Sequence, residues 1–269
     1  LCDRLAVGAG AHREAIAQYA RTLRFGESLP PVRRAELLER GGHECYIADR
    51  FDEGVKWLEA AISIRQIAGD RLREGDALRQ LSSIQRCGAL TAEGEETGRR
   101  AVELLETCPP SQELASAYAN LAMVALNNND LDAAVSAAAR GLELARRFGY
   151  TEVVVHTLNT IGTAELIEGN AEGREKLEQS LRLAQEGGLE EHIGRAYMHL
   201  AEIAERNRDF ELGDRYSGPG VDYCSKHGVD LWLRSSEADT DLEVTLTEVR
   251  PDGQEEYIQS GWLRASHRA

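Results

Sequence analysis

The feature that most constrains the fold of this chain is a pattern that recurs about every forty residues. Short polar turns, each followed by a new helical pattern, place equivalent residues at Phe51, Thr91, Leu131, Ala171 and Phe210. The steps between these positions are 40, 40, 40 and 39 residues. A fixed period of this length is typical of stacked repeats, because each unit buries its apolar face only against its neighbours. We therefore expect an extended stack of similar units.

Each unit divides into two helical patterns. Residues 111–126 carry apolar side chains three and four positions apart, which places them on one helix face. Asn127–Asp130 interrupts this pattern, and residues 131–148 resume it up to Gly149, a residue type that commonly ends helices. The next unit repeats the plan at 153–167 and 171–185. The sequence predicts about five helical pairs.

Small residues recur where two helices must approach closely. A glycine inside a helix costs about 1 kcal/mol relative to alanine, so its repeated use at one register indicates a packing requirement. The positions are Ala122, Gly162 and Ala201 in the first helices, and Gly54, Gly94, Ala134 and Gly213 early in the second helices.

A large residue, then Leu or Ile, then a small residue and an Asn or Asp turn recur in successive units, as in Tyr118, Leu121 and Ala122. This pattern resembles tetratricopeptide repeats, with units longer than usual. The resemblance implies an all-α fold, a right-handed α-α superhelix of about five helical pairs. We assign it to residues 1–216.

Residues 11–216 resemble, more narrowly, the repeat region of large LuxR-type bacterial transcriptional regulators. The segments that carry this resemblance are Glu74–Arg79, Tyr118–Ala122, His156–Glu165 and Gly188–His192. In that family such regions sense a signal or restrain neighbouring domains. The family's ATPase and DNA-binding parts have no counterpart here, since a phosphate-binding Gly-x-x-x-x-Gly-Lys-Ser/Thr loop is absent from the sequence.

The pattern changes after Tyr216. Ser217–Gly220 contains a proline and two glycines, which disfavour a helix interior, so we expect an irregular junction over 217–230. From Val229 the apolar residues alternate, and Arg250–Gly253 is a turn signal before a returning strand at 255–263. We predict a short β segment over 231–269, a hairpin preceded by one earlier strand.

The tail, at about 229–269, resembles part of the C-terminal β-sandwich of cocaine-esterase-like and X-Pro dipeptidyl-peptidase-like hydrolases. The segments that carry it are Leu231–Ser236, Asp239–Val249, Pro251–Gly253 and Gly261–Arg268. The nucleophile of such hydrolases lies on Gly-x-Ser-x-Gly, which does not occur in this sequence. No catalytic residue is therefore carried over.

The formal net charge of −15 disfavours direct binding of nucleic acid. No apolar run approaches the ~18 residues that a membrane span needs, and no signal peptide is recognised. The five cysteines form no Cys-x-x-Cys pair, and we interpret them as buried free thiols in a reducing cytoplasm.

No catalytic, metal or cofactor site is predicted. His192 and His199 are seven residues apart, whereas a helical metal site more naturally uses a spacing of four, so we interpret both as exposed or core-rim histidines. We expect that the protein is not an enzyme.

In a tetratricopeptide stack the first helix of each unit lines the concave groove. Polar side chains on these helices are candidates for holding a peptide backbone or a carboxylate, against the alternative of a solvated helix face. They are Arg79, Arg86, Asn120, Asn127, His156, Asn159, Arg195, Glu202 and Arg206.

Three functions remain open. The first is a non-catalytic scaffold that binds a protein, a peptide or a small effector, as the regulatory module of a bacterial transcriptional regulator. The second is an accessory or truncated piece of a serine hydrolase. The third is a structural scaffold that self-associates, since unpaired solenoid ends leave apolar faces uncovered.

Overall fold

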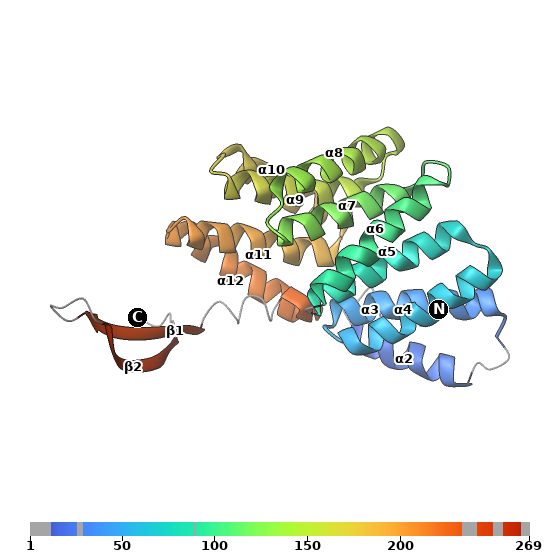
Figure 1. The fold of residues 1–269 in the computed structure, drawn as a ribbon, viewed down its shortest axis with the longest axis horizontal. Coiled ribbons are helices and arrows are strands. Elements are labelled where there is room, and N and C mark those ends of the chain that lie inside the picture. The colour runs from blue at the N-terminus through green and yellow to red at the C-terminus, as the bar shows by residue number, and fades with distance from the viewer. Residues whose placement is uncertain (1–11, 26–28, 89, 233–240, 250–254, 265–269) are drawn as a thin grey trace.

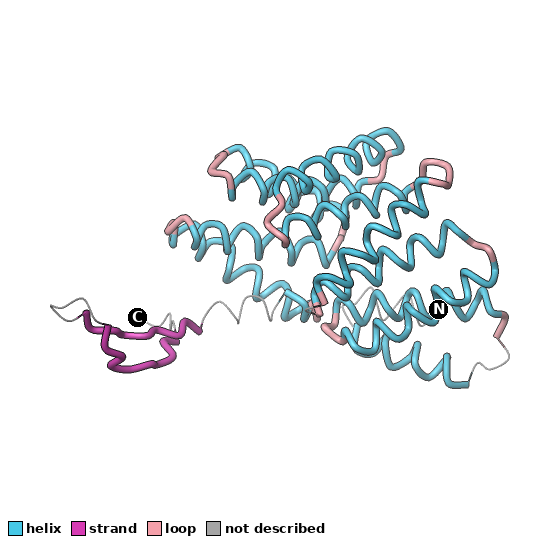
Figure 2. The backbone as a smooth tube through the Cα atoms, viewed as in Figure 1, coloured by secondary structure: helices cyan, strands magenta, loops and turns pink. Residues whose placement is uncertain are grey.

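The computed structural model of the chain describes residues 12–25, 29–88, 90–232, 241–249 and 255–264 (Figures 1 and 2). Its elements are α2 (His12–Phe25), α3 (Pro31–Ile47), α4 (Phe51–Ala68), α5 (Arg71–Cys87), α6 (Thr91–Glu106), α7 (Gln112–Asn127), α8 (Leu131–Phe148), α9 (Thr151–Ile167), α10 (Glu172–Gly187), α11 (Glu190–Arg206), α12 (Phe210–His227), β1 (Asp241–Val249) and β2 (Glu255–Arg264).

Five consecutive helical pairs form the body, from α3 with α4 to α11 with α12, and α2 packs on α3. The second helix of each pair begins within one residue of the position that the forty-residue pattern marks. The pairs stack one on another (Figure 1), and the stack is a right-handed α-α superhelix. The predicted fold class and number of pairs are thus confirmed.

Local sequence sets both kinds of turn. Within the pairs, Asp49, Asn129, Gly169 and Arg208 stand at equivalent places and have φ values of 57°, 58°, 84° and 60°. Between the pairs, Gly69, Gly149, Gly188 and Gly228 end a helix in the left-handed conformation, in which a side chain would be strained. The recurrence of these turns along the described residues helps to keep the stack regular.

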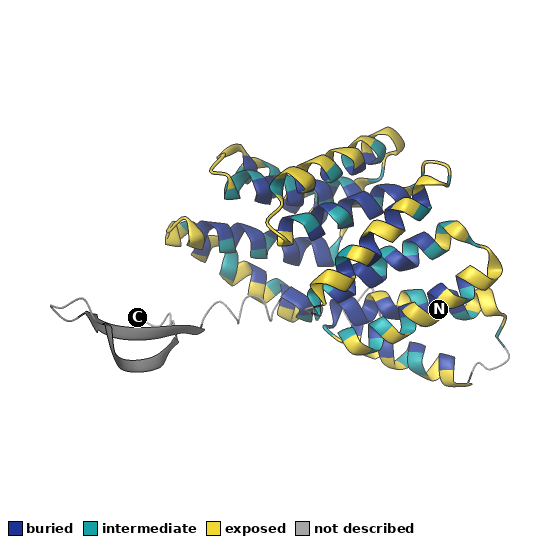
Figure 3. Ribbon diagram, in the orientation of Figure 1, coloured by how far each residue is buried: buried dark blue, intermediate teal, exposed yellow. Residues whose placement is uncertain are grey.

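The predicted close approach of helices is confirmed at several small residues. A Cβ atom on Gly162 would lie 2.6 Å from the carbonyl oxygen of Gly173, and one on Gly173 would lie 2.3 Å from that of Gly162. Helices α9 and α10 therefore touch through their backbones. A Cβ on Gly94 would similarly lie 3.0 Å from the backbone nitrogen of Arg86. Figure 3 shows the buried residues along the faces between neighbouring helices.

The expected irregular junction at 217–230 is wrong, because α12 runs through Ser217–Gly220 to His227. Pro219 lies on the exposed side of the helix, where water can satisfy the carbonyl that loses its bond. Gly220 is buried, and a Cβ there would lie 2.8 Å from the Cβ of Tyr197. Close packing of α12 on α11 thus outweighs the local propensity.

The strand expected from Val229 is also wrong, because Asp230–Trp232 is helical. The first helices of successive pairs begin at 71, 112, 151 and 190, so a helix that begins at 230 continues the repeat. Val229, Leu231 and Trp232 are all buried, a pattern that suits a helix packed on the last pair as well as it suits a strand. The helical repeat therefore extends beyond residue 216 to at least Trp232.

Strands β1 and β2 pair in antiparallel fashion, from Asp241 with Arg264 to Val249 with Glu255, with an irregularity between Leu246 and Thr247. The predicted hairpin is thus confirmed, whereas its turn at 250–253 lies outside the described residues. None of the described helices is long and apolar enough to cross a membrane.

Candidate functional site

A cavity of about 320 Å³ lies in the interior of the superhelix, and the first helix of every pair contributes to its wall. Tyr46 comes from α3, Arg79 from α5, Ala119 from α7, His156 from α9 and Arg195 from α11. Because helices of the same register line the cavity, its shape follows from the curvature of the stack.

A wider groove of about 930 Å³ adjoins this cavity along α3, α4 and α5. The two share His43, Arg73, Asp76, Arg79 and Gln80 in their walls. The groove and the cavity together form one polar inner surface.

Arg195 forms the floor of the cavity and is only 3% exposed. It donates from Nε and Nη2 to Oε1 of Glu191 at 3.1 and 2.7 Å, and from Nη1 to Nε2 of His156 at 2.7 Å. Its Nη2 also donates to the hydroxyl of Tyr46 at 3.2 Å. The guanidinium lies over the ring of Trp232, 5.5 Å from the ring centre. Arg195 is thus engaged by four side chains from three helices and from the segment after α12.

The charges on the floor are set by burial and by these partners. Burial and the Arg195 charge hold the pKa of His156 well below its usual value, so His156 is neutral and its Nε2 accepts a hydrogen bond from Arg195. Burial opposes the charge of Glu191, but Arg195 and His192 hold its pKa well below the usual range. Glu191 and Arg195 therefore remain a charged pair at neutral pH.

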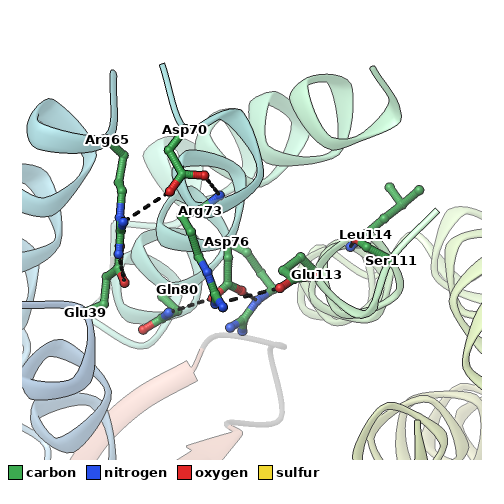
Figure 4. Close-up of polar contacts among 10 residues, drawn as sticks. Glu39, Arg65, Asp70, Arg73, Asp76, Gln80, Ser111, Glu113 and Leu114 are labelled. Atoms are coloured by element: carbon green, nitrogen blue, oxygen red, sulfur yellow. Dashed lines mark hydrogen bonds and ion pairs between the residues drawn. The ribbon is translucent and has the colours of Figure 1, made fainter. Parts of the chain in front are cut away.

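The opposite wall carries a second polar cluster on α5 (Figure 4). Asp76 accepts from Nε of Arg79 at 2.8 Å and from Nε2 of Gln80 at 3.1 Å. Arg73 reaches towards Glu113 on α7, at 3.7 Å between Nη1 and Oε1. The side-chain amide oxygen of Gln80, Oε1, is buried and has no hydrogen-bond partner among the described residues. This wall therefore combines an unpaired buried acceptor on Gln80 with the donors of Arg79.

In the groove wall Arg65 donates from Nε and Nη2 to the carboxylate of Glu39 at 2.7 and 3.0 Å. It also donates from Nη1 to Asp70 at 3.1 Å, as Figure 4 shows. Arg65 is buried and saturated by acidic partners, so it stabilises the join of α3 and α4.

Of the nine sequence-predicted residues, the structure brings Arg79, His156 and Arg195 together at the cavity. Asn120 is instead buried between helices, where it donates to Ser82 at 2.8 Å and accepts from Ser83 at 2.7 Å. Asn159 is also buried, and neither atom of its amide has a hydrogen-bond partner among the described residues.

The remaining candidates, Arg86, Asn127, Glu202 and Arg206, lie towards the C-terminal ends of the first helices. With its amide correctly oriented, Asn127 accepts from Nη1 of Arg86 at 3.2 Å. Arg206 lies 3.7 Å from Glu202 on the same helix, and its side chain is exposed. None of these four residues lines the cavity.

Several residues of the site were missed or misread from sequence. His192 and His199 are buried rather than exposed or at the core rim, each 7% exposed. His192 lies 2.6 Å from Glu191, and His199 bonds Thr163 at 3.0 Å. Tyr46, at the end of α3, could not be placed because its partners lie far along the chain. The charged run Glu190–His192 at the start of a first helix was the sequence feature that could have indicated the buried charges of the cavity floor.

Comparisons with known proteins agree with this geometry. A model of the tetratricopeptide repeat matches residues 115–148. A model of the X-Pro dipeptidyl-peptidase C-terminal non-catalytic domain matches residues 227–269, which include the start of the helix at 230. No curated protein matches the chain.

Three solved structures are similar in fold. The Rap protein complexed with competence and sporulation factor has a TM-score of 0.67 at 11% identity, covering 83% of this chain and 62% of that chain. NprR in complex with its cognate peptide NprX has a TM-score of 0.68 at 12% identity, and the match covers 88% of this chain and 69% of that chain. The Rap conjugation gene regulator of plasmid pLS20, in complex with the Phr* peptide, has a TM-score of 0.64 at 15% identity. This match covers 88% of this chain and 71% of that chain.

This chain spans less than two thirds of the first of these proteins. At such identities the likeness concerns the fold alone. Together with the five helical pairs, it shows that this chain is a tetratricopeptide-like helical repeat protein.

Proposed function

We propose that this chain is a non-catalytic scaffold that binds an extended peptide, or an extended segment of a protein, against the inner surface of the superhelix. The observation that carries the proposal is the cavity of about 320 Å³ that all five first helices line and that adjoins a groove of about 930 Å³. A strand-like segment lying in the groove would place one or two side chains in the cavity.

The chemistry of the inner surface suits a peptide. A peptide unit offers one N–H donor and one carbonyl acceptor. The side-chain oxygen of Gln80, a residue in the walls of both the cavity and the groove, has no donor among the described residues. An unpaired buried polar group costs about 1–3 kcal/mol, so a ligand or water that pairs with it is favoured. We assign contact with the bound segment to Arg79 and Gln80, and support of the floor to Arg195.

The solved complexes support the same ligand class, since NprR and the pLS20 regulator are each described with a bound peptide. With the resemblance of residues 11–216 to LuxR-type repeats, this supports a place as the regulatory module of a bacterial regulator. The net charge of −15 disfavours contact with DNA by this chain itself. A small effector in the cavity is the alternative within this proposal.

A second candidate rests on the tail. The match of residues 227–269 to a non-catalytic hydrolase domain supports an accessory or truncated piece of a serine hydrolase. Measurable esterase or aminopeptidase turnover by the purified chain would support this candidate, whereas we expect none, since the sequence lacks Gly-x-Ser-x-Gly.

The test is selection of binders from a random peptide library displayed on phage, followed by calorimetric titration of the selected peptides. We expect one-to-one binding that Arg79→Ala weakens about tenfold, which corresponds to about 1.4 kcal/mol. Arg99→Ala is the matched control, because Arg99 is an exposed ion-paired arginine on α6, outside the cavity.

Selected peptides that bind both variants and the unmodified chain equally would contradict the assignment of Arg79. Failure to select any specific binder would contradict the proposed function as a whole.

A further inference from the structure

The two ends of the superhelix contact each other, although more than two hundred residues separate some of the contacting side chains. Arg13 on α2 donates from Nε to the carboxylate of Asp230 at 2.8 Å, and its Nη2 lies 2.7 Å from the same oxygen. His12, beside it, bridges two acidic residues from different parts of the fold. Its Nδ1 lies 2.6 Å from Glu44 on α3, and its Nε2 lies 3.5 Å from Glu190 on α11.

We propose that these five residues, His12, Arg13, Glu44, Glu190 and Asp230, form a clasp that holds the superhelix closed and that opens when His12 loses its proton. This inference rests on the proposed function in one respect: the opening regulates the access of a partner to the inner surface.

The clasp closes the interior because its contacts join the first described helix to the last pair. Below the clasp, the hydroxyl of Tyr46 donates to Glu191 at 3.3 Å, again from α3 to α11. An extended chain that enters the cavity from this side must separate α3 from α11. The curvature of a repeat stack results from small rotations between units, so separation of the ends requires only a small change at each interface.

The geometry makes the charge of His12 decisive. A protonated imidazole between two carboxylates attracts both, whereas a neutral imidazole leaves the carboxylates of Glu44 and Glu190 facing each other. Loss of the proton therefore removes the charge attraction to both carboxylates, and the neutral ring can donate a hydrogen bond to only one of them. The side chains of His12 and Glu44 are only 3% and 5% exposed, so solvent screens this change weakly.

The groups around the clasp define the direction of the response. Burial opposes the charge of His12, but Glu44 and Glu190 raise its pKa above the ordinary 6.5. A group with a raised pKa stabilises the closed form fully below its ordinary pKa, and this contribution is lost as the pH rises through the raised value. Closure is therefore favoured near pH 6 and weakened in mildly alkaline solution.

The titratable and charged groups nearest to the clasp are His227, Tyr223 and the Arg13–Asp230 pair. His227 on α12 lies 3.0 Å from the other oxygen of Glu190 and stacks on Tyr223. Burial raises the pKa of Tyr223 to about 12, so this ring stays neutral. The Arg13–Asp230 pair does not include His12, so loss of the His12 proton weakens the clasp without removing it.

The experiment measures the closure directly and needs no partner. Spin labels on unnatural side chains at Arg21 of α2 and Lys226 of α12, both exposed, avoid the native cysteines. Double electron–electron resonance then gives the distance between the ends from pH 6 to pH 8.5. We expect one short distance at pH 6 and a growing population of longer distances as the pH rises.

Two variants test the assignment, and far-UV circular dichroism checks that each is folded. His12→Gln keeps a hydrogen-bond donor but cannot titrate, so the distance distribution should no longer depend on pH. Glu190→Gln removes one of the bridged charges and should raise the open population already at pH 6. Arg99→Gln, which alters an exposed ion pair on α6, should follow the unmodified chain.

A distance that does not change over this pH range would overturn the clasp, as would a His12→Gln variant that retains the full response. The outcomes are separable from those of the peptide selection. If the distance responds to pH but no peptide is selected, the clasp stands and the proposed function fails.

Discussion

Arg195 donates a hydrogen bond to the hydroxyl of Tyr46 at 3.2 Å, although 149 residues separate the two in sequence. Tyr46 in turn donates to Glu191, the ion-pair partner of Arg195. The hydroxyl therefore joins α3 to the buried pair on α11. This triad joins the floor of the cavity to the end of α3.

We expect Tyr46→Phe to lower the free energy of unfolding by about 1.5–3 kcal/mol, the usual range for a buried hydrogen bond to a charged group. Urea unfolding followed by circular dichroism measures the change. Tyr150→Phe is the control, because Tyr150 is half-buried and its hydroxyl makes no hydrogen bond to the described residues, so loss of the hydroxyl should alter stability by less than about 0.5 kcal/mol. Equal effects of the two changes would show that the triad adds no stability.

Gly173→Ala should destabilise the protein by about 1–3 kcal/mol, since the new methyl group would meet the backbone of α9. Gly218→Ala offers the matched comparison, because a Cβ there meets no atom within 4 Å and the residue lies inside α12. Its expected effect is a gain of up to about 1 kcal/mol from helix propensity. Thermal and urea unfolding distinguish the two, and destabilisation by both changes would contradict the packing explanation.

Stability should fall as the pH is lowered from 6.5 towards 3, because of His199. Burial, together with the nearby Arg195 charge, lowers the pKa of His199 to about 3. Between these values the unfolded chain binds a proton that the folded chain does not, so acid favours unfolding. At pH 5 this loss is about 2 kcal/mol, since each pH unit is worth about 1.4 kcal/mol.

The measurement is urea unfolding at a series of pH values. His199→Asn should lose the part of the dependence that His199 contributes and keep the part that comes from His156 and Glu191, whereas His43→Asn, a change at an exposed histidine, should retain all of it. A His199→Asn variant with an unaltered dependence would refute the assignment to this residue.

A chain shortened to residues 1–216 should be much less stable than one that ends at residue 232. Removal of 217–232 deletes buried Cys224, Leu231 and Trp232, and the loss of one large buried side chain already costs about 3–5 kcal/mol. Chemical unfolding of both shortened chains tests this. If the two chains are equally stable, the helical domain ends near residue 216, as the sequence pattern suggested.

The sequence predicted the repeated framework closely, because period and turn chemistry are local properties. The positions that mark the second helices, the glycine that ends α8 and the antiparallel hairpin all follow from residues close together in the chain. Small residues at recurring positions, such as Gly94 and Gly162, also predicted the close packing of helices.

Local patterns were insufficient where packing opposes propensity. Pro219 and its flanking glycines predicted an interruption, yet α12 continues because its proline faces solvent and Gly220 fits against Tyr197. The alternation of Val229 and Leu231 predicted a strand, yet the repeat register and burial against α11 favour a helix. Three apolar positions cannot by themselves distinguish these periods.

The candidate site was predictable only in part. The sequence placed Arg79, His156 and Arg195 on first helices, and the structure brings them to one cavity. It could not pair Arg195 with Tyr46, or His12 with Glu190, because these contacts depend on how far the whole stack curves. By itself the sequence determined the units and their turns. The tertiary structure decided which ends meet and which charges are buried, since curvature is a sum over all the interfaces between units.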